Sequence, residues 1–223
     1  MRYACLTLHR PAFVFKGSHD GYSDSNPAPV LFQNGTVLLL WRSAGCACSD
    51  GCPALASPLP GTCATNKHSC WQSRLHLAKA YHWSNVSSYD FDRQTLFPCG
   101  LAPNVAERGA EDPYLYRDAR TGAYHAVLHR NGCKDGGAGC SPAVSGQHAY
   151  SPDGFKWHLS AADAYTASVT YTDGATEMLR QRERPHLILD PVSGVPTHLI
   201  TGAGVGAGTD YTYTHIQPIR RRG

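Results

Sequence analysis

The chain has 223 residues and a formal net charge of +3 with histidine neutral. Its hydrophobic content of 42% and aromatic content of 10% exclude a disordered chain, and its length suffices for one large all-β domain or two small ones. Lys and Arg are scattered except for a terminal run at 220–222, so we expect no nucleic-acid partner. We also expect no membrane partner, because the sequence has no apolar window of about 18 residues.

The first 25 residues are irregular, with one expected strand at 12–15. Residues 1–9 lack the sustained apolar stretch of a signal peptide. The first clear element is a hairpin at 28–42, where a proline and an apolar strand precede an Asn-Gly turn and a second apolar strand.

This hairpin pattern occurs three times. It returns at 113–129 and at 185–201, and the leading prolines, Pro29, Pro113 and Pro185, are separated by 84 and 72 residues. Such a spacing is too long for a small solenoid repeat and suits one blade of a β-propeller, in which the hairpin supplies half of a four-stranded sheet. We therefore expect an all-β fold, with residues 1–223 forming a single β-propeller domain. Three hairpins are too few to close a ring, so we expect an incomplete propeller of about three to four blades.

Between the first two hairpins, residues 43–70 form a Cys-rich segment that we expect to be a loop insertion. Five of the nine cysteines fall here, at positions 46, 48, 52, 63 and 70. A zinc site is the alternative to disulfides, but the cluster lacks the paired Cys-x2-Cys spacing of zinc ribbons, which favours disulfides. Two glycosylation sequons begin at Asn34 and Asn85. Together these features predict a secreted, extracellular protein.

The remaining segments are also strand-like. Residues 74–81 alternate, residues 147–157 read as a hairpin around a Pro-Asp-Gly turn, and residues 165–173 are β-branched and aromatic. A terminal strand is expected at 211–214. We find no long stretch with a helical period.

The residues before the repeated prolines are the candidates for chemistry, because the innermost strands of a propeller line its channel. Glu111, Asp112 and Glu183 fall at these positions in two different repeats. Two acids held across a cleft are what glycoside hydrolysis requires: one protonates the leaving oxygen, and the other activates water or attacks the sugar. The alternative is that these acids cap strands or form ion pairs.

Three motifs carry a family resemblance: residues 111–116 (Glu-Asp-Pro-Tyr-Leu-Tyr), 151–157 (Ser-Pro-Asp-Gly-Phe-Lys-Trp) and 182–187 (Arg-Glu-Arg-Pro-His-Leu). With these three motifs in this order, the chain resembles the five-bladed β-propeller glycosidases. These comprise the family-43-type arabinanases and xylosidases and, more distantly, the invertases and levansucrases. The resemblance covers about residues 26–201. It implies that Glu183 is the catalytic acid and Asp112 the acid that orients and tunes. The family's first Asp has no clean match, since the repeat places Ala28 there, and Asp24 is our candidate for it.

The candidate substrate-binding residues surround these acids. Trp71, expected in a loop, is a candidate platform for a sugar ring. The full set is Asn26, Trp71, Glu111, His129, His148, Arg182, Arg184 and His186. We predict no metal ligand among them and no cofactor, although some relatives carry a cation in the channel.

Two functions remain open at this point. The first is a glycoside hydrolase that cleaves O-glycosidic bonds in oligo- or polysaccharides by carboxylate acid/base catalysis. The second is a non-catalytic carbohydrate-binding propeller, or an inactive fragment of such an enzyme, which the missing first Asp favours. In both cases we expect a monomer with a carbohydrate as its partner.

Overall fold

A computed structural model describes six parts of the chain: residues 24–46, 71–90, 95–96, 110–130, 145–204 and 212–219. Apart from one 3-10 turn, η1 (Val86–Ser88), all regular structure in these ranges is β. Within them, no helix is long and apolar enough to cross a membrane.

The described strands form three main antiparallel sheets and one small hairpin. Blade 1 contains β1 (Asp24–Leu31), β2 (Val37–Cys46), β3 (Trp71–Ala80) and β4 (Tyr89–Asp90), with β5 (Thr95–Leu96) also paired to β3. Blade 2 contains β6 (Ala110–Arg117), β7 (Tyr124–Arg130), β8 (Ser145–Ser151) and β9 (His158–Tyr165). Blade 3 contains β12 (Gln181–Leu189), β13 (Pro196–Gly204) and β14 (Thr212–Pro218). The hairpin pairs β10 (Ser168–Thr170) with β11 (Thr176–Met178).

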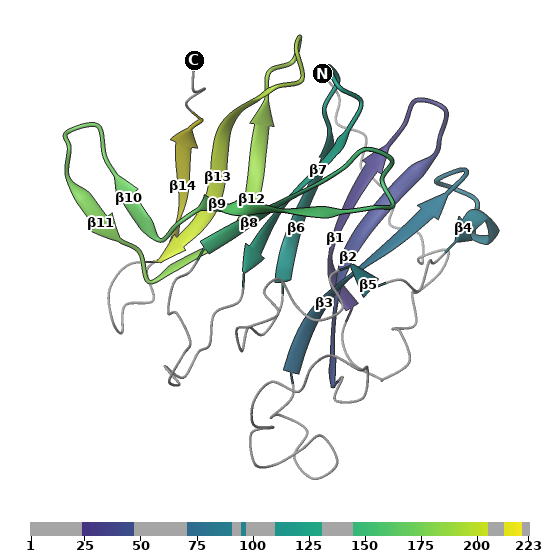
Figure 1. Ribbon diagram of the computed structural model, residues 1–223, viewed down its shortest axis with the longest axis horizontal. Helices are drawn as coiled ribbons and strands as arrows, with labels where there is room; N and C mark the ends of the chain where they lie inside the picture. Colours follow the sequence, from purple (N-terminus) through teal and green to yellow (C-terminus); the bar gives the residue numbers. More distant parts are fainter. Residues whose placement is uncertain are drawn as a thin grey trace, which may run out of the picture.

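The three blades follow one another in chain order, as Figure 1 shows. Each starts at its inner strand and runs outward through hairpins, and inner strand β6 contacts both β1 and β12. Sheets that meet along their first strands are the arrangement of a β-propeller. The all-β propeller fold expected from the sequence is therefore confirmed.

The core lies between the blades, because each sheet buries side chains on both faces. In β7 the alternation of side chains sends Ala126 and Leu128 to one face and Val127 to the other. Leu128 packs against blade 1 residues such as Leu40 and Leu77 in the largest cluster. Val127 joins Tyr165, Leu187 and Leu199 in a smaller cluster that links blade 2 to blade 3. Packing on both faces holds the inner strands in fixed positions.

The repeated hairpins are confirmed as β1–β2, β6–β7 and β12–β13, but some boundaries differ from expectation. Residues 43–46 continue β2, since a strand opposite them in β3 pairs with every one. Trp71 is the first residue of β3 and does not lie in a loop. The rest of the Cys-rich segment, the remaining cysteines and the expected strand at 12–15 lie outside the described residues. Asn34 and Asn85 are exposed, and their glycosylation stays a prediction.

Candidate functional site

Each blade begins with the same irregular step, in which a residue before a proline takes a left-handed backbone conformation. The residues are Asn26, Asp112 and Arg184, with φ values of 53°, 50° and 54°. They are the only described non-glycine residues with positive φ, and the strand register shifts at each. Such a conformation is uncommon outside glycine and persists only where the surroundings enforce it, often at functional sites.

These steps correct the repeat register read from the sequence. Asn26-Pro27, and not Ala28-Pro29, is the equivalent of Asp112-Pro113, so the first separation is 86 residues instead of 84. The segment 27–29 contains two prolines, and the sequence alone does not show which of them follows the shift in strand register. Asn26 therefore stands where the family's first Asp was sought.

The three steps meet at the carboxyl group of Asp112. Asn26 Nδ2 donates a hydrogen bond to Asp112 Oδ1, and the backbone N–H of Arg184 donates to Asp112 Oδ2 over 3.2 Å. Asp112 is buried, and burial raises the pKa of its carboxyl group; the negative charge of Glu111 adds to this, while His129 and Arg184 oppose it. One acid thus joins all three described blades.

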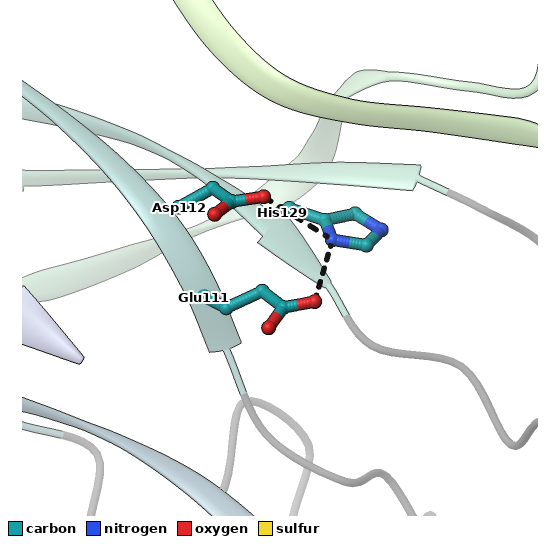
Figure 2. Close-up of side chains that lie close together, drawn as sticks. All are labelled: Glu111, Asp112 and His129. Atoms are coloured by element: carbon teal, nitrogen blue, oxygen red, sulfur yellow. Dashed lines mark hydrogen bonds and ion pairs between the residues drawn. The ribbon is translucent and has the colours of Figure 1, made fainter. Parts of the chain in front are cut away.

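Next to Asp112, Glu111 forms a chain of polar contacts between blades 1 and 2. Arg42 Nη1 lies 2.9 Å from Glu111 Oε2, and His129 Nδ1 lies 3.2 Å from Glu111 Oε1. The same imidazole nitrogen is 4.0 Å from Asp112 Oδ2. Figure 2 shows this nitrogen directed at both acids and the other ring nitrogen turned away. His129 pairs directly with Glu111 across β6 and β7, which places both side chains on one face.

Tyr165 lies beside this group because a glycine lets its ring cross β8. Gly146 pairs with His129 on one side and Tyr165 on the other, and a Cβ at Gly146 would stand 1.9 Å from a ring carbon of Tyr165. The Tyr165 hydroxyl is buried and has no hydrogen-bond partner among the described residues. Burial raises its pKa; Arg182 opposes this, and Asp112, Glu183 and Glu111 each raise it further. Tyr165 therefore lies across Gly146 from His129, the residue that contacts Glu111 and Asp112.

Arg182 is buried against the ring of Tyr165. It is only 1% exposed, and its guanidinium lies 5.0 Å from the centre of the Tyr165 ring. Its nitrogens donate to Thr201 Oγ1, to the Thr166 carbonyl and to Gln217 Oε1. This burial favours a structural role over the substrate-binding role expected from the sequence.

Glu183 and Arg184 begin β12 on the blade 3 side of the site. Glu183 is half-buried, and none of the described residues forms a hydrogen bond or ion pair with its carboxylate. Arg184 is exposed, and its backbone N–H contacts Asp112.

His148 and His186 lie away from the acids. His148 Nε2 is 3.0 Å from His125 Nδ1, within a row of stacked rings on blade 2; burial lowers the pKa of His148, and so does the charge of His125. His186 is exposed and meets Tyr114 edge-on at 5.3 Å. The side chains of Asp24 and Trp71 are outside what the structure describes; their backbones begin β1 and β3.

Two residues of the site, Arg42 and Tyr165, were not identified by the sequence analysis. Arg42 pairs with Ser25 as His129 pairs with Glu111, so the corrected repeat register would have pointed to it. Tyr165 carried no local signal, because its position depends on Gly146 in the adjacent strand.

Glu111, Asp112 and His129 form the only group of described residues whose acid and imidazole atoms lie close enough to share a cation, within 4.8 Å of one another. Arg42 already places a positive charge beside Glu111, and the Nδ1 atom of His129 bridges the acids. The arrangement therefore favours a hydrogen-bonded cluster over a metal centre.

No protein-family model matches the sequence, and neither does any curated protein. Among solved structures, the chain is similar to a propeller enzyme, which places it in the class of β-propeller folds. That structure is an endo-arabinase from Bacteroides thetaiotaomicron, with a TM-score of 0.50 and 12% sequence identity. The match covers 91% of this chain and 58% of the arabinase chain. At this identity the likeness establishes the fold alone.

Proposed function

We propose that the protein is a glycoside hydrolase that cleaves O-glycosidic bonds in oligo- or polysaccharides. The observation that carries the proposal is that Asp112 on blade 2 accepts a hydrogen bond from the backbone N–H of Arg184 on blade 3, the residue next to Glu183. Acids held at the beginning of inner strands on different blades can flank a sugar, which is the arrangement that glycosidic bond cleavage needs.

In this proposal the two acids of the expected pair have different roles. Glu183, unengaged by any described residue, is the general acid that protonates the leaving oxygen. Asp112 is the fixed acid: two hydrogen bonds hold it, and its carboxyl group orients the site and tunes its neighbours. The solvent-exposed side chain of Arg184 is available to bind sugar hydroxyls.

A carbohydrate is the proposed substrate, and the likeness to an endo-arabinase makes arabinan the first polymer to test. The cysteines and the two sequons support a secreted protein, which we propose alongside the activity.

A specific observation favours a second candidate, a carbohydrate-binding propeller without catalysis. Asn26, an amide, occupies the position where the family's first Asp was sought, and it donates its hydrogen bond to Asp112. An amide there can bind a sugar hydroxyl but cannot take a proton from water.

The test is a hydrolysis screen with arabinan and with aryl arabinofuranoside, xyloside, fructoside and galactoside. We expect wild-type hydrolysis of at least one substrate and a loss of about 10²–10⁴-fold in Glu183→Gln. Glu177→Gln is the matched control, because Glu177 accepts a hydrogen bond from Tyr171 in the separate β10–β11 hairpin. No hydrolysis by the wild type, together with measurable sugar binding, would leave the binding function instead.

A further inference from the structure

Among the described side chains of the site, no acid stands at the position of the family's first Asp, and the side chain of Asp24 lies outside what the structure describes. Asn26 cannot activate water, and the Asp112 carboxyl group is buried and accepts hydrogen bonds from Asn26 and from the backbone of Arg184. A general base must offer a lone pair toward the substrate, so this role falls to a polar group other than Asn26 and Asp112.

His129 has the required geometry. Its Nδ1 atom lies 3.2 Å from a carboxylate oxygen of Glu111, and an ionised carboxylate only accepts hydrogen bonds, so Nδ1 carries the proton. The lone pair of the neutral ring then lies on Nε2, which Figure 2 shows turned away from both acids. No described residue forms a hydrogen bond with Nε2. Nε2 is thus unbonded within the described part of the chain, in a side chain that is 6% exposed.

Glu111 is fixed as a positioning residue for this imidazole. Arg42 holds one carboxylate oxygen at 2.9 Å, which leaves the other to orient His129. A carboxylate that fixes the tautomer of a histidine and stabilises the imidazolium is the arrangement that activates general-base histidines in hydrolases. The groups that face His129 are Glu111 and Asp112 from β6 and, across Gly146, the Tyr165 phenol from β9.

We propose that His129, oriented by Glu111, is the general base of the reaction, an inference that rests on the proposed hydrolase function. Nε2 takes a proton from a water molecule as the water oxygen bonds to the anomeric carbon. The bond from that carbon to the leaving oxygen breaks, and Glu183 supplies the proton that this oxygen gains. His129 then releases its proton to solvent, and Glu183 regains one. Because water attacks directly, the product has the inverted anomeric configuration.

The experiment uses the full-length protein and the substrate that the wild type hydrolyses fastest. We expect His129→Ala to lose about 10²–10⁴-fold in kcat, and added imidazole to restore part of the rate because it can occupy the vacated space. His158→Gln, on the exposed end of blade 2, is the matched control and should remain within about twofold of the wild type. Glu111→Gln keeps the shape of the side chain and should lower kcat by at least about tenfold, with little change in KM.

The outcomes separate this inference from the hydrolase proposal. If Glu183→Gln is inactive while His129→Ala stays within about threefold of the wild type, the hydrolase proposal stands and the His129 base is wrong. A folded but inactive His129→Ala that imidazole does not rescue would also contradict the base role, as would a retained anomeric configuration in the wild-type product. If chelation abolishes wild-type activity and added Ca²⁺ or Zn²⁺ restores it, His129 is a metal ligand instead. If His129→Ala does not fold, the Glu111→Gln rate and the product anomer decide. A wild type that hydrolyses nothing overturns both proposals.

Discussion

Asp112 is the residue at which the three described blades meet, and its removal should destabilise the whole domain. Asp112→Ala removes the buried carboxyl group that accepts hydrogen bonds from the Asn26 side chain and from the Arg184 backbone N–H. An unsatisfied buried donor costs about 1–3 kcal/mol, so we expect a loss of this size in the free energy of unfolding, measured by urea denaturation. Asp163→Ala is the control, because its exposed contact with Arg130 is worth about 0–1 kcal/mol. Equal losses in the two variants would contradict this role for Asp112.

Gly146 is a second residue whose effect can be predicted from one contact. A methyl group there would overlap the Tyr165 ring, so Gly146→Ala should cost about 1–3 kcal/mol of stability through overpacking. The displaced ring should also lower the rate of any hydrolysis, since Tyr165 lies across Gly146 from His129. Gly202→Ala provides the comparison, because the nearest atom to its added Cβ is 3.7 Å away. Thermal unfolding of both variants checks the difference, and an unaffected Gly146→Ala would refute the proposed packing of Tyr165.

At the scale of the element, blade 2 carries a row of stacked rings that crosses all four of its strands: Tyr116, His125, His148, Tyr150 and His158. Burial raises the pKa of Tyr116 to about 12 and lowers the pKa values of His125 and His148. Burial therefore favours the neutral forms of Tyr116, His125 and His148.

This row predicts a loss of stability in mild acid. A histidine whose folded pKa lies below the unfolded value of 6.5 binds its proton more readily in the unfolded chain. The contribution of such a histidine to the free energy of unfolding is complete above pH 6.5. It is lost as the pH falls from 6.5 toward the lower pKa of the folded protein. We expect the melting temperature of the wild type to fall across this window and His148→Gln to weaken that dependence. An identical pH dependence in the variant would show that the row is not responsible.

The hairpins were predictable from the sequence, whereas the alignment of their first residues was not. Alternating apolar residues and turn signals identify β1–β2, β6–β7 and β12–β13 directly. The register of β1 was placed two residues late because Pro27 and Pro29 are equally good markers, and only the backbone conformation of Asn26 distinguishes them. Arg182 and Glu183 are neighbours in sequence, but Arg182 is fully buried and Glu183 is half-buried, a difference that the sequence does not reveal.

At the scale of the whole molecule, the repeat was sufficient to predict a propeller, and the site was predictable only in part. Asp112, Glu111 and Glu183 were selected because repeated strand starts converge in this fold. Arg42 and Tyr165 were missed because their contacts join blades or cross a glycine, and no local pattern records such contacts. The chain spans 58% of the length of the arabinase that it resembles.

The most direct test of the account is a crystal structure of Glu183→Gln with an oligosaccharide of the best wild-type substrate. We expect the sugar at the inner end of blades 2 and 3, with the glycosidic oxygen beside position 183 and a water molecule on the opposite side near His129 Nε2. A sugar bound only elsewhere, such as along the ring row of blade 2, with the acids left in contact with solvent, would contradict the assignment of this site.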